Sequence, residues 1–202
     1  MKIALVQMDV AHGQPVENKK HVKEMLERAL VANPDVIVLP EMWNTGYALD
    51  ELDGLADKEG LESQEFLSQF AREHAVAILG GSVAIERDGK FYNTTYVYNK
   101  SGNLINIYSK VHLFGLMAED RYMSAGDAES IFELDGVIAA SVICYDIRFP
   151  EQPDLSESLR AECSDETEYT SSYPTGNVSV TNEVKQFRLG TNYLDFVMWM
   201  LQ

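Results

Sequence analysis

The chain has 202 residues, a length for one domain or at most two small ones, and its 46% hydrophobic residues can form a core. Its 32 acidic and 16 basic residues give a formal net charge of -16. Because so acidic a chain repels phosphates and anionic headgroups, we expect neither nucleic acid nor a membrane surface as its partner.

Cysteine use and the N-terminus indicate the cellular compartment. The two cysteines, Cys144 and Cys163, form no C-x-x-C motif and have no histidine cluster nearby, which argues against a zinc site and a disulfide framework. The apolar run at the N-terminus is too short for a signal peptide, and no segment approaches the length that spans a bilayer. These features predict a cytoplasmic protein.

The first part of the chain alternates strand and helix patterns. Apolar, β-branched runs predict strands, and apolar residues three and four positions apart predict amphipathic helices. In order, these patterns give a strand over 2–8, a helix from 18 to about 33, a buried strand over 36–39, a loop over 44–60, a helix ending near 74 and a strand over 76–84. The pair Gly80-Gly81 in the last strand predicts a bulge or a close backbone approach rather than a phosphate loop, because no P-loop follows.

The second part of the chain is a succession of strands. Glycine-containing turns at 88–89 and 101–103 introduce two runs of strand formers, which predict an antiparallel hairpin. Two more strands are predicted over 131–134 and 137–143. Strand–helix alternation followed by strands favours an α/β fold with a layer of helices over a sheet.

Three side chains that can carry chemistry follow the ends of apolar strands: Glu41, Lys110 and Cys144. Open α/β sheets place their sites at such ends. The carboxylate can take the thiol proton, and the ammonium can hold negative charge on a thiolate or a tetrahedral intermediate, which suits acyl transfer. The alternatives are a solvated strand end, a surface lysine and a small buried hydrophobe, and sequence spacing does not show that the three residues meet.

Three motifs resemble those of the carbon–nitrogen hydrolase (nitrilase) superfamily, in the family's order, over residues 1–151. They are V-L-P-E-M-W-N-T-G-Y around Glu41, Y-S-K-V-H-L-F around Lys110, and V-I-C-Y-D-I-R-F-P-E around Cys144. The resemblance implies an α/β fold of the α-β-β-α sandwich type with a Glu-Lys-Cys triad. It also implies that Glu119 supports this triad.

The mechanism that the resemblance implies needs no metal or organic cofactor. Glu41 accepts the thiol proton, Cys144 attacks the amide carbon, and Lys110 holds the oxyanion together with the backbone N–H of Tyr145. Ammonia leaves, and Glu41 activates the water that hydrolyses the thioester. We expect Lys110 to favour the thiolate at neutral pH. Arg148 is a weaker candidate, either as a clamp for a substrate carboxylate or as the partner of a buried acid.

The substrate is expected to be a small-molecule amide. The motifs C-Y-D-I-R-F-P-E and H-L-F-G-L-M look closest to the ω-amidase-like branch, whose members hydrolyse the side-chain amide of 2-oxo acids such as 2-oxoglutaramate. A nitrile or an N-carbamoyl compound is the alternative substrate class. We expect His112 to pack or hydrogen-bond rather than to catalyse, and Cys163 to be a bystander.

Residues 152–202 do not match the family's second half, so we divide the chain into a catalytic region, 1–151, and an atypical tail. The polar, acidic part over 152–182 is typical of loop or disorder. The apolar end over 193–201 predicts a helix or a strand docked on the rest of the chain, or else an exposed apolar end. An amidase is one hypothesis. The other is a truncated or chimeric protein, catalytically impaired and at most an interaction module. The homo-oligomer that the family implies stays open for this chain, which we expect to be marginally folded or self-associating.

Overall fold

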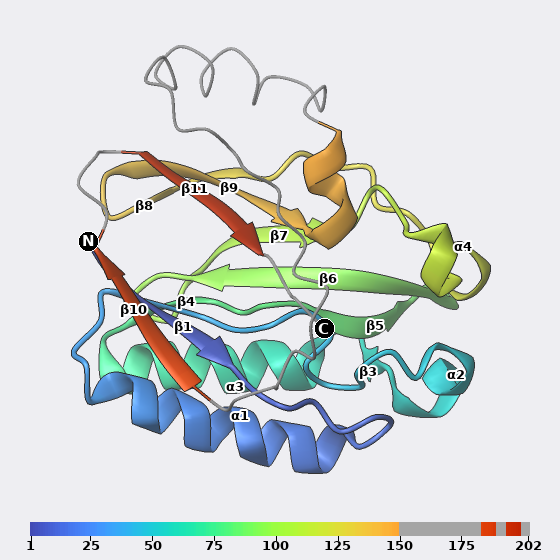
Figure 1. Cartoon of the computed structure of the whole chain (residues 1–202), viewed down its shortest axis with the longest axis horizontal. Helices are drawn as coiled ribbons and strands as arrows, with labels where there is room; N and C mark the ends of the chain where they lie inside the picture. The colour runs from blue at the N-terminus through green and yellow to red at the C-terminus, as the bar shows by residue number, and fades with distance from the viewer. Residues whose placement is uncertain (150–182, 189–192, 199–202) are drawn as a thin grey trace, which may run out of the picture.

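The computed structural model describes residues 1–149, 183–188 and 193–198. Two long helices lie against one face of an eight-stranded sheet, and a three-stranded sheet packs on its other face (Figure 1). The mixed α/β fold predicted from the sequence is therefore confirmed, with one helical layer and two β layers among the described residues.

The elements follow one another along the chain with these bounds: β1 (Lys2–Gln7), α1 (Pro15–Leu30), β2 (Val36–Val38), η1 (Leu49–Glu51), α2 (Leu52–Leu55), β3 (Asp57–Lys58), α3 (Leu61–His74), β4 (Ala77–Leu79), β5 (Val83–Arg87), β6 (Lys90–Tyr98), β7 (Leu104–Ser109), η2 (Gly115–Met117), α4 (Glu119–Tyr122), β8 (Ile131–Leu134), β9 (Val137–Ile143), η3 (Cys144–Arg148), β10 (Glu183–Arg188) and β11 (Tyr193–Met198).

The large sheet has the strand order β10-β1-β2-β4-β6-β5-β3, with β7 paired to β6. Its central strands β1, β2 and β4 are parallel, and α1 and α3 form the crossovers that parallel pairing requires. The apolar stripes of these helices pack on the strands. This core includes Val22, Met25 and Leu26 of α1, Leu67, Phe70 and Ala71 of α3, and Ala4, Val6, Ile37 and Ile78 of the sheet.

A second apolar cluster fills the space between the two sheets. In β2, Val36 and Val38 face the small sheet whereas Ile37 faces the helices, which explains why this strand is apolar throughout. The small sheet, of order β11-β9-β8, contributes Phe132, Leu134 and Ala139 to the same cluster.

The structure confirms most of the predicted elements. β1, β2, β8, β9, α3 and the antiparallel β6–β7 hairpin lie where the sequence patterns place them. Helix α1 begins at Pro15 rather than at Asn18, because the fixed φ of proline suits the first helical position.

Two segments differ from their predictions. The loop predicted over 44–60 contains η1, α2 and β3, which are too short to show a periodic pattern. The strand predicted over 76–84 is two strands, because the chain turns at Gly80-Gly81 between β4 and β5. A Cβ on Gly81, at φ +61°, would lie 2.0 Å from the Pro40 carbonyl oxygen, so the predicted close backbone approach is confirmed.

Two strands of the C-terminal part, β10 and β11, pair with strands from earlier in the chain. β10 runs antiparallel to β1, and β11 runs parallel to β9. Within the apolar end, Tyr193–Met198 forms the strand β11, whereas β10 was not predicted. Residues 152–182, with Cys163, lie outside the described residues. Within the described ranges, no helix combines the length and the apolar character needed to cross a bilayer.

Candidate active site

Strand ends bring the three candidate residues together. Glu41 follows β2, Lys110 directly follows β7 of the same sheet, and Cys144 directly follows β9 of the small sheet. Glu41 and Lys110 are buried, and Cys144 is partly buried. The sequence did not show whether these three residues meet, and in the structure their side chains interact with one another.

Lys110 sits between two buried carboxylates. Its Nζ lies 3.2 Å from Oε1 of Glu41 and 2.8 Å from Oε1 of Glu119. The other oxygen of Glu119 accepts the backbone N–H of Phe114 at 2.7 Å. Charges buried to this extent require such pairing, because an isolated one would be strongly destabilising.

The protonation of this cluster follows from burial and charge. Burial alone would lower the pKa of Lys110, but the negative charges of Glu41 and Glu119 outweigh it and raise the pKa, so the ammonium stays charged. Burial raises the pKa of Glu119, and the Lys110 charge and the Phe114 N–H counteract this only in part.

The thiol of Cys144 is hydrogen-bonded to Glu41. Burial, and next the charge of Glu41, raise the pKa of Cys144 to about 11, although Lys110 acts to lower it. Lys110 therefore acts in the expected direction, toward the thiolate, but burial and the charge of Glu41 outweigh it, so the resting thiol is protonated. Attack by this sulfur must be accompanied by proton transfer, and Glu41 is in place to accept the proton.

The backbone of Cys144 is strained. Its φ of +50° lies in the left-handed region, which costs roughly 1–2 kcal/mol for a residue other than glycine. The residue opens the turn η3 at the end of β9. Such outliers persist where the surrounding structure fixes them, and they cluster at functional sites.

Two residues that the sequence analysis missed contact Glu41. The amide nitrogen of Asn93 donates to Oε1 of Glu41 at 2.8 Å, and the amide oxygen of Asn93 has no hydrogen-bond partner within the described part of the chain. Tyr47 also hydrogen-bonds to Glu41, and burial together with nearby negative charges raises its pKa, so its hydroxyl stays neutral. A polar residue within a run of strand formers is the sequence signal that points to Asn93.

The other candidate residues lie around the turn η3. Tyr145 packs its ring against Phe114 and Phe149, with centroids 4.9 and 5.3 Å away, and Arg148 is exposed. His112 stacks on Phe149 at 3.8 Å, in the packing role expected of it. The oxyanion role of the Tyr145 N–H and the clamp role of Arg148 stay predictions.

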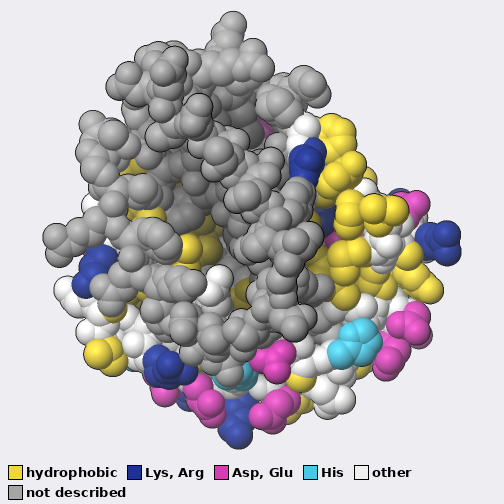
Figure 2. All heavy atoms as spheres, in the orientation of Figure 1, with side chains coloured by type: hydrophobic (Ala, Val, Ile, Leu, Met, Phe, Trp, Pro, Cys, Tyr) yellow, Lys and Arg dark blue, Asp and Glu magenta, His cyan; other side chains and the backbone are white. Residues whose placement is uncertain are grey.

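An apolar surface borders the segment that carries Glu119. Leu116, Met117 and Tyr122 of η2 and α4 are exposed, and Figure 2 shows hydrophobic side chains gathered on the side where α4 lies.

Within the described residues, no three His, Cys, Asp or Glu side chains form a group that could hold a metal ion.

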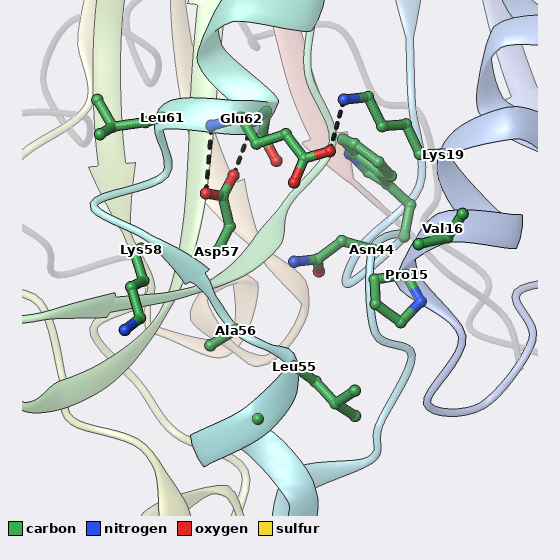
Figure 3. A pocket seen from close by; sticks show the side chains of 13 residues that line it. Pro15, Val16, Lys19, Asn44, Leu55, Ala56, Asp57, Lys58, Leu61 and Glu62 are labelled. Atoms are coloured by element: carbon green, nitrogen blue, oxygen red, sulfur yellow. Dashed lines mark hydrogen bonds and ion pairs between the residues drawn. The ribbon is translucent and has the colours of Figure 1, made fainter.

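A separate cavity of about 460 Å³ opens beside the helical layer (Figure 3). The residues that line it do not include Glu41, Lys110, Glu119 or Cys144. Its polar groups are engaged in the fold: the amide of Asn44 bonds the backbone of Ala84, Asp57 accepts the first N–H groups of α3, and Lys19 pairs with Glu62. This cavity is therefore separate from the residues at the strand ends.

Known proteins are similar to this chain over most of its length. Residues 2–162 match the model of the carbon-nitrogen hydrolase family. The 2-oxoglutaramate amidase of Bacillus subtilis is 47% identical over 149 residues, which are 74% of this chain and 57% of that protein. An omega-amidase of Xenopus tropicalis is 34% identical over 161 residues, which are 76% of this chain and 58% of that protein.

A solved structure shows the same fold. The crystal structure of Nit3 from Saccharomyces cerevisiae, a branch 10 member of the nitrilase superfamily, has a TM-score of 0.68 at 29% sequence identity. The alignment covers 75% of this chain and 56% of Nit3, so the chain spans less than two thirds of the length of these relatives. Because the family model matches most of the chain, and the fold agrees with a member of known structure, the chain belongs to the carbon-nitrogen hydrolase family of the nitrilase superfamily.

Proposed function

We propose that this chain hydrolyses the carbon–nitrogen bond of an amide through a cysteine thioester and releases ammonia. The observation that carries this proposal is a buried cluster of four side chains. In it, Lys110 pairs with both Glu41 and Glu119, and Glu41 accepts a hydrogen bond from the Cys144 thiol. A base, a nucleophile and a fixed positive charge are the groups that acyl transfer needs.

The first half of the reaction uses the protonated resting thiol. Glu41 takes the proton as the Cys144 sulfur bonds to the amide carbon, and the carbonyl oxygen becomes an oxyanion held by Lys110 and the Tyr145 N–H. The carbon–nitrogen bond then breaks, and Glu41 returns the proton to the departing nitrogen. The products of this half-reaction are ammonia and an acyl-thioester on Cys144.

The second half of the reaction regenerates the thiol. Glu41 takes a proton from a water molecule, the resulting hydroxide bonds to the thioester carbon, and the carbon–sulfur bond breaks with return of the proton to Cys144. Glu119 and Asn93 support this cycle, because they hold Lys110 and Glu41 through bonds of 2.8 Å each. Their contacts fix the base and the cation before substrate enters.

The substrate that we propose is the ω-amide of a small 2-oxo acid. The names of the relatives from Bacillus subtilis and Xenopus tropicalis support this choice. The exposed Arg148, four residues after Cys144, is the candidate to bind the substrate carboxylate. A nitrile or an N-carbamoyl compound is the alternative.

Ammonia release tests the proposal. The full chain should release ammonia from 2-oxoglutaramate, and Cys144→Ser should reduce release to background, because the site is arranged for a thiol nucleophile. Cys163→Ser is the matched control and should retain activity within a small factor. Equal loss in both variants, or full activity in Cys144→Ser, would show that Cys144 is not the nucleophile.

A second candidate function is an interaction module with impaired catalysis. The observation that favours it is that the family model matches residues 2–162 and leaves residues 163–202 outside the match. If no amide, nitrile or N-carbamoyl compound of a panel yields ammonia while the protein melts cooperatively, this second function is the one supported.

A further inference from the structure

The turn η3, which begins at Cys144, contains a buried carboxylate that bonds residues both inside and outside this part of the chain. Asp146 is buried in η3, and its Oδ2 accepts the Tyr108 hydroxyl at 2.7 Å and the Ile143 N–H at 3.1 Å. Its Oδ1 accepts the backbone N–H of His112 at 2.7 Å and lies 3.0 Å from Nδ1 of the same residue. All four contacts are within hydrogen-bond range.

These contacts join two segments of the candidate site. Ile143 is the residue directly before Cys144, so one contact fixes the entry to the nucleophile turn. The other donors come from the residues two positions before and two positions after Lys110. One carboxylate therefore connects the backbone of the nucleophile to the backbone of the cation.

The turn needs such a restraint. Cys144 has a left-handed φ of +50°, a conformation that an unrestrained residue of this type leaves readily. Hydrogen bonds from N–H groups to an ionised carboxylate are roughly twice as strong as neutral ones. The carboxylate is therefore suited to hold the strained conformation.

We propose that Asp146 is a positioning residue, whose carboxylate locks the strained turn at Cys144 to the Lys110 segment and so holds the thiol against Glu41. The effect on thiol geometry stands on these contacts alone, whereas the effect on turnover rests on the proposed amide hydrolysis. Asp146 does not touch the reacting atoms; it acts through the two residues that do.

An amide at this position cannot replace the carboxylate. An asparagine side chain has one oxygen that accepts and one NH₂ group that only donates. In one orientation the NH₂ group meets the Ile143 N–H, and in the other it meets the His112 N–H. Asp146→Asn therefore leaves a buried backbone N–H without an acceptor in either orientation, although the side chain has nearly the same volume.

The test is alkylation of Cys144 by iodoacetamide across alkaline pH, in full chains that carry Cys163→Ser so that a single thiol reacts. In the parent the reaction should follow a pKa of about 11. In Asp146→Asn the thiol leaves its buried position beside Glu41, so the pKa should move toward the ordinary value near 8.5, with alkylation at mildly alkaline pH faster by roughly tenfold or more. Ammonia release should lose about a hundredfold in kcat with KM changed far less.

Asp57→Asn is the matched control. Asp57 also accepts two backbone N–H groups, those of Glu62 and Ser63 at the start of α3, but far from Cys144 in the sequence. This variant should lower the melting temperature and leave the alkylation profile of the parent unchanged. An alkylation profile that shifts equally in both variants would assign Asp146 a general structural role and overturn the proposal.

Tyr108→Phe keeps the test decisive if Asp146→Asn does not fold. It removes a single donor to Asp146 and should shift the alkylation profile in the same direction by a smaller amount. A folded Asp146→Asn with the parent profile, or an unchanged Tyr108→Phe where Asp146→Asn is unfolded, would refute the proposal. A shifted profile in protein that releases no ammonia would support Asp146 and reject the amide hydrolysis.

Discussion

Two lysines of this chain each pair with two carboxylates, in opposite environments. Lys110 is buried between Glu41 and Glu119, whereas Lys100 is 38% exposed between Asp35 and Asp135. Removal of one partner from a buried ionic cluster typically costs about 3–5 kcal/mol, and removal from a surface pair about 0–1 kcal/mol. We expect Lys110→Met to lower the free energy of unfolding in urea by the larger amount and Lys100→Met by the smaller.

The same variant tests the charge at the candidate site. Because Lys110 lowers the pKa of the Cys144 thiol, Lys110→Met should raise it further and slow alkylation at every pH below that value. It should also reduce kcat for the proposed hydrolysis by on the order of a hundredfold, as deletion of one oxyanion donor does. Lys100→Met should change neither quantity. Similar stability losses in the two variants would contradict the contrast in burial.

At the residue scale, the sequence identifies the charged and nucleophilic groups but not the residues that hold them. Glu41, Lys110 and Cys144 are visible because each follows an apolar strand within a motif. The roles of Asn93 and Asp146 are not visible, although Asn93 stands out as a polar residue among strand formers, because their partners lie far away in the chain: Glu41 is 52 residues from Asn93, and Tyr108 is 38 residues from Asp146. Such pairings depend on how strands are placed in the sheets, which a local pattern does not encode.

At the scale of elements, the turn between β4 and β5 supports the Glu41 segment. Ser82 in this turn donates its backbone N–H to the Pro40 carbonyl at 3.1 Å and accepts the Met42 N–H on its hydroxyl oxygen at 3.0 Å. Gly81 lies against the Pro40 carbonyl oxygen, as its lack of a Cβ permits. Gly81 thus allows the turn to approach the loop that carries Glu41.

We expect Gly81→Ala to be much more destabilising than Gly89→Ala. Both glycines have left-handed φ values, +61° and +70°, so both variants place alanine in the same unfavourable region. A Cβ on Gly89 meets nothing within 4 Å, whereas a Cβ on Gly81 meets backbone at 2.0 Å. Overpacking of this kind adds about 1–3 kcal/mol.

Urea unfolding of the two glycine variants measures this difference, and ammonia release measures its effect on the site. Gly81→Ala should also lose activity, because the displaced backbone directly precedes Glu41, whereas Gly89→Ala should keep it. Equal losses of stability in the two variants would mean that the turn moves freely to admit the methyl group.

The elements that the sequence predicted are those with a periodic pattern or a clear turn. Helices α1 and α3 and most strands of the two sheets have such patterns, so the order of these elements was predicted correctly. Helix α2 spans Leu52–Leu55 and strand β3 spans Asp57–Lys58, lengths that show no period. Strand β10 pairs with β1 at the opposite end of the chain, a partnership that no local feature indicates.

At the scale of the whole molecule, the two apolar clusters make the large sheet the centre of the fold. Its strands bury side chains toward α1 and α3 on one face and toward the small sheet on the other. The alternation in β2 anticipates this, because a strand that is apolar at every position must be covered on both sides. The packing of one sheet on the other was implied by the family resemblance, and the apolar pattern of the strands does not predict it.

The outer face of the small sheet carries an apolar strip. Ile131 pairs with Ala140, and Ile138 lies two residues from Ala140, so the two isoleucines are diagonal neighbours on one face. They are 43% and 46% exposed. The long helices among the described residues lie against the other sheet (Figure 1). Adjacent exposed apolar side chains on a sheet favour association with another surface of the same kind.

We therefore expect the chain to self-associate through this face, and Ile138→Lys to shift it toward the monomer in sedimentation velocity, because a charge there would have to be desolvated on association. Val31→Lys is the control: Val31 is 89% exposed, but it follows α1 in the helical layer. It should leave the distribution of species unchanged. A parent chain that stays monomeric at every concentration, or an equal effect of both substitutions, would show that the Ile131–Ile138 strip is not a contact surface.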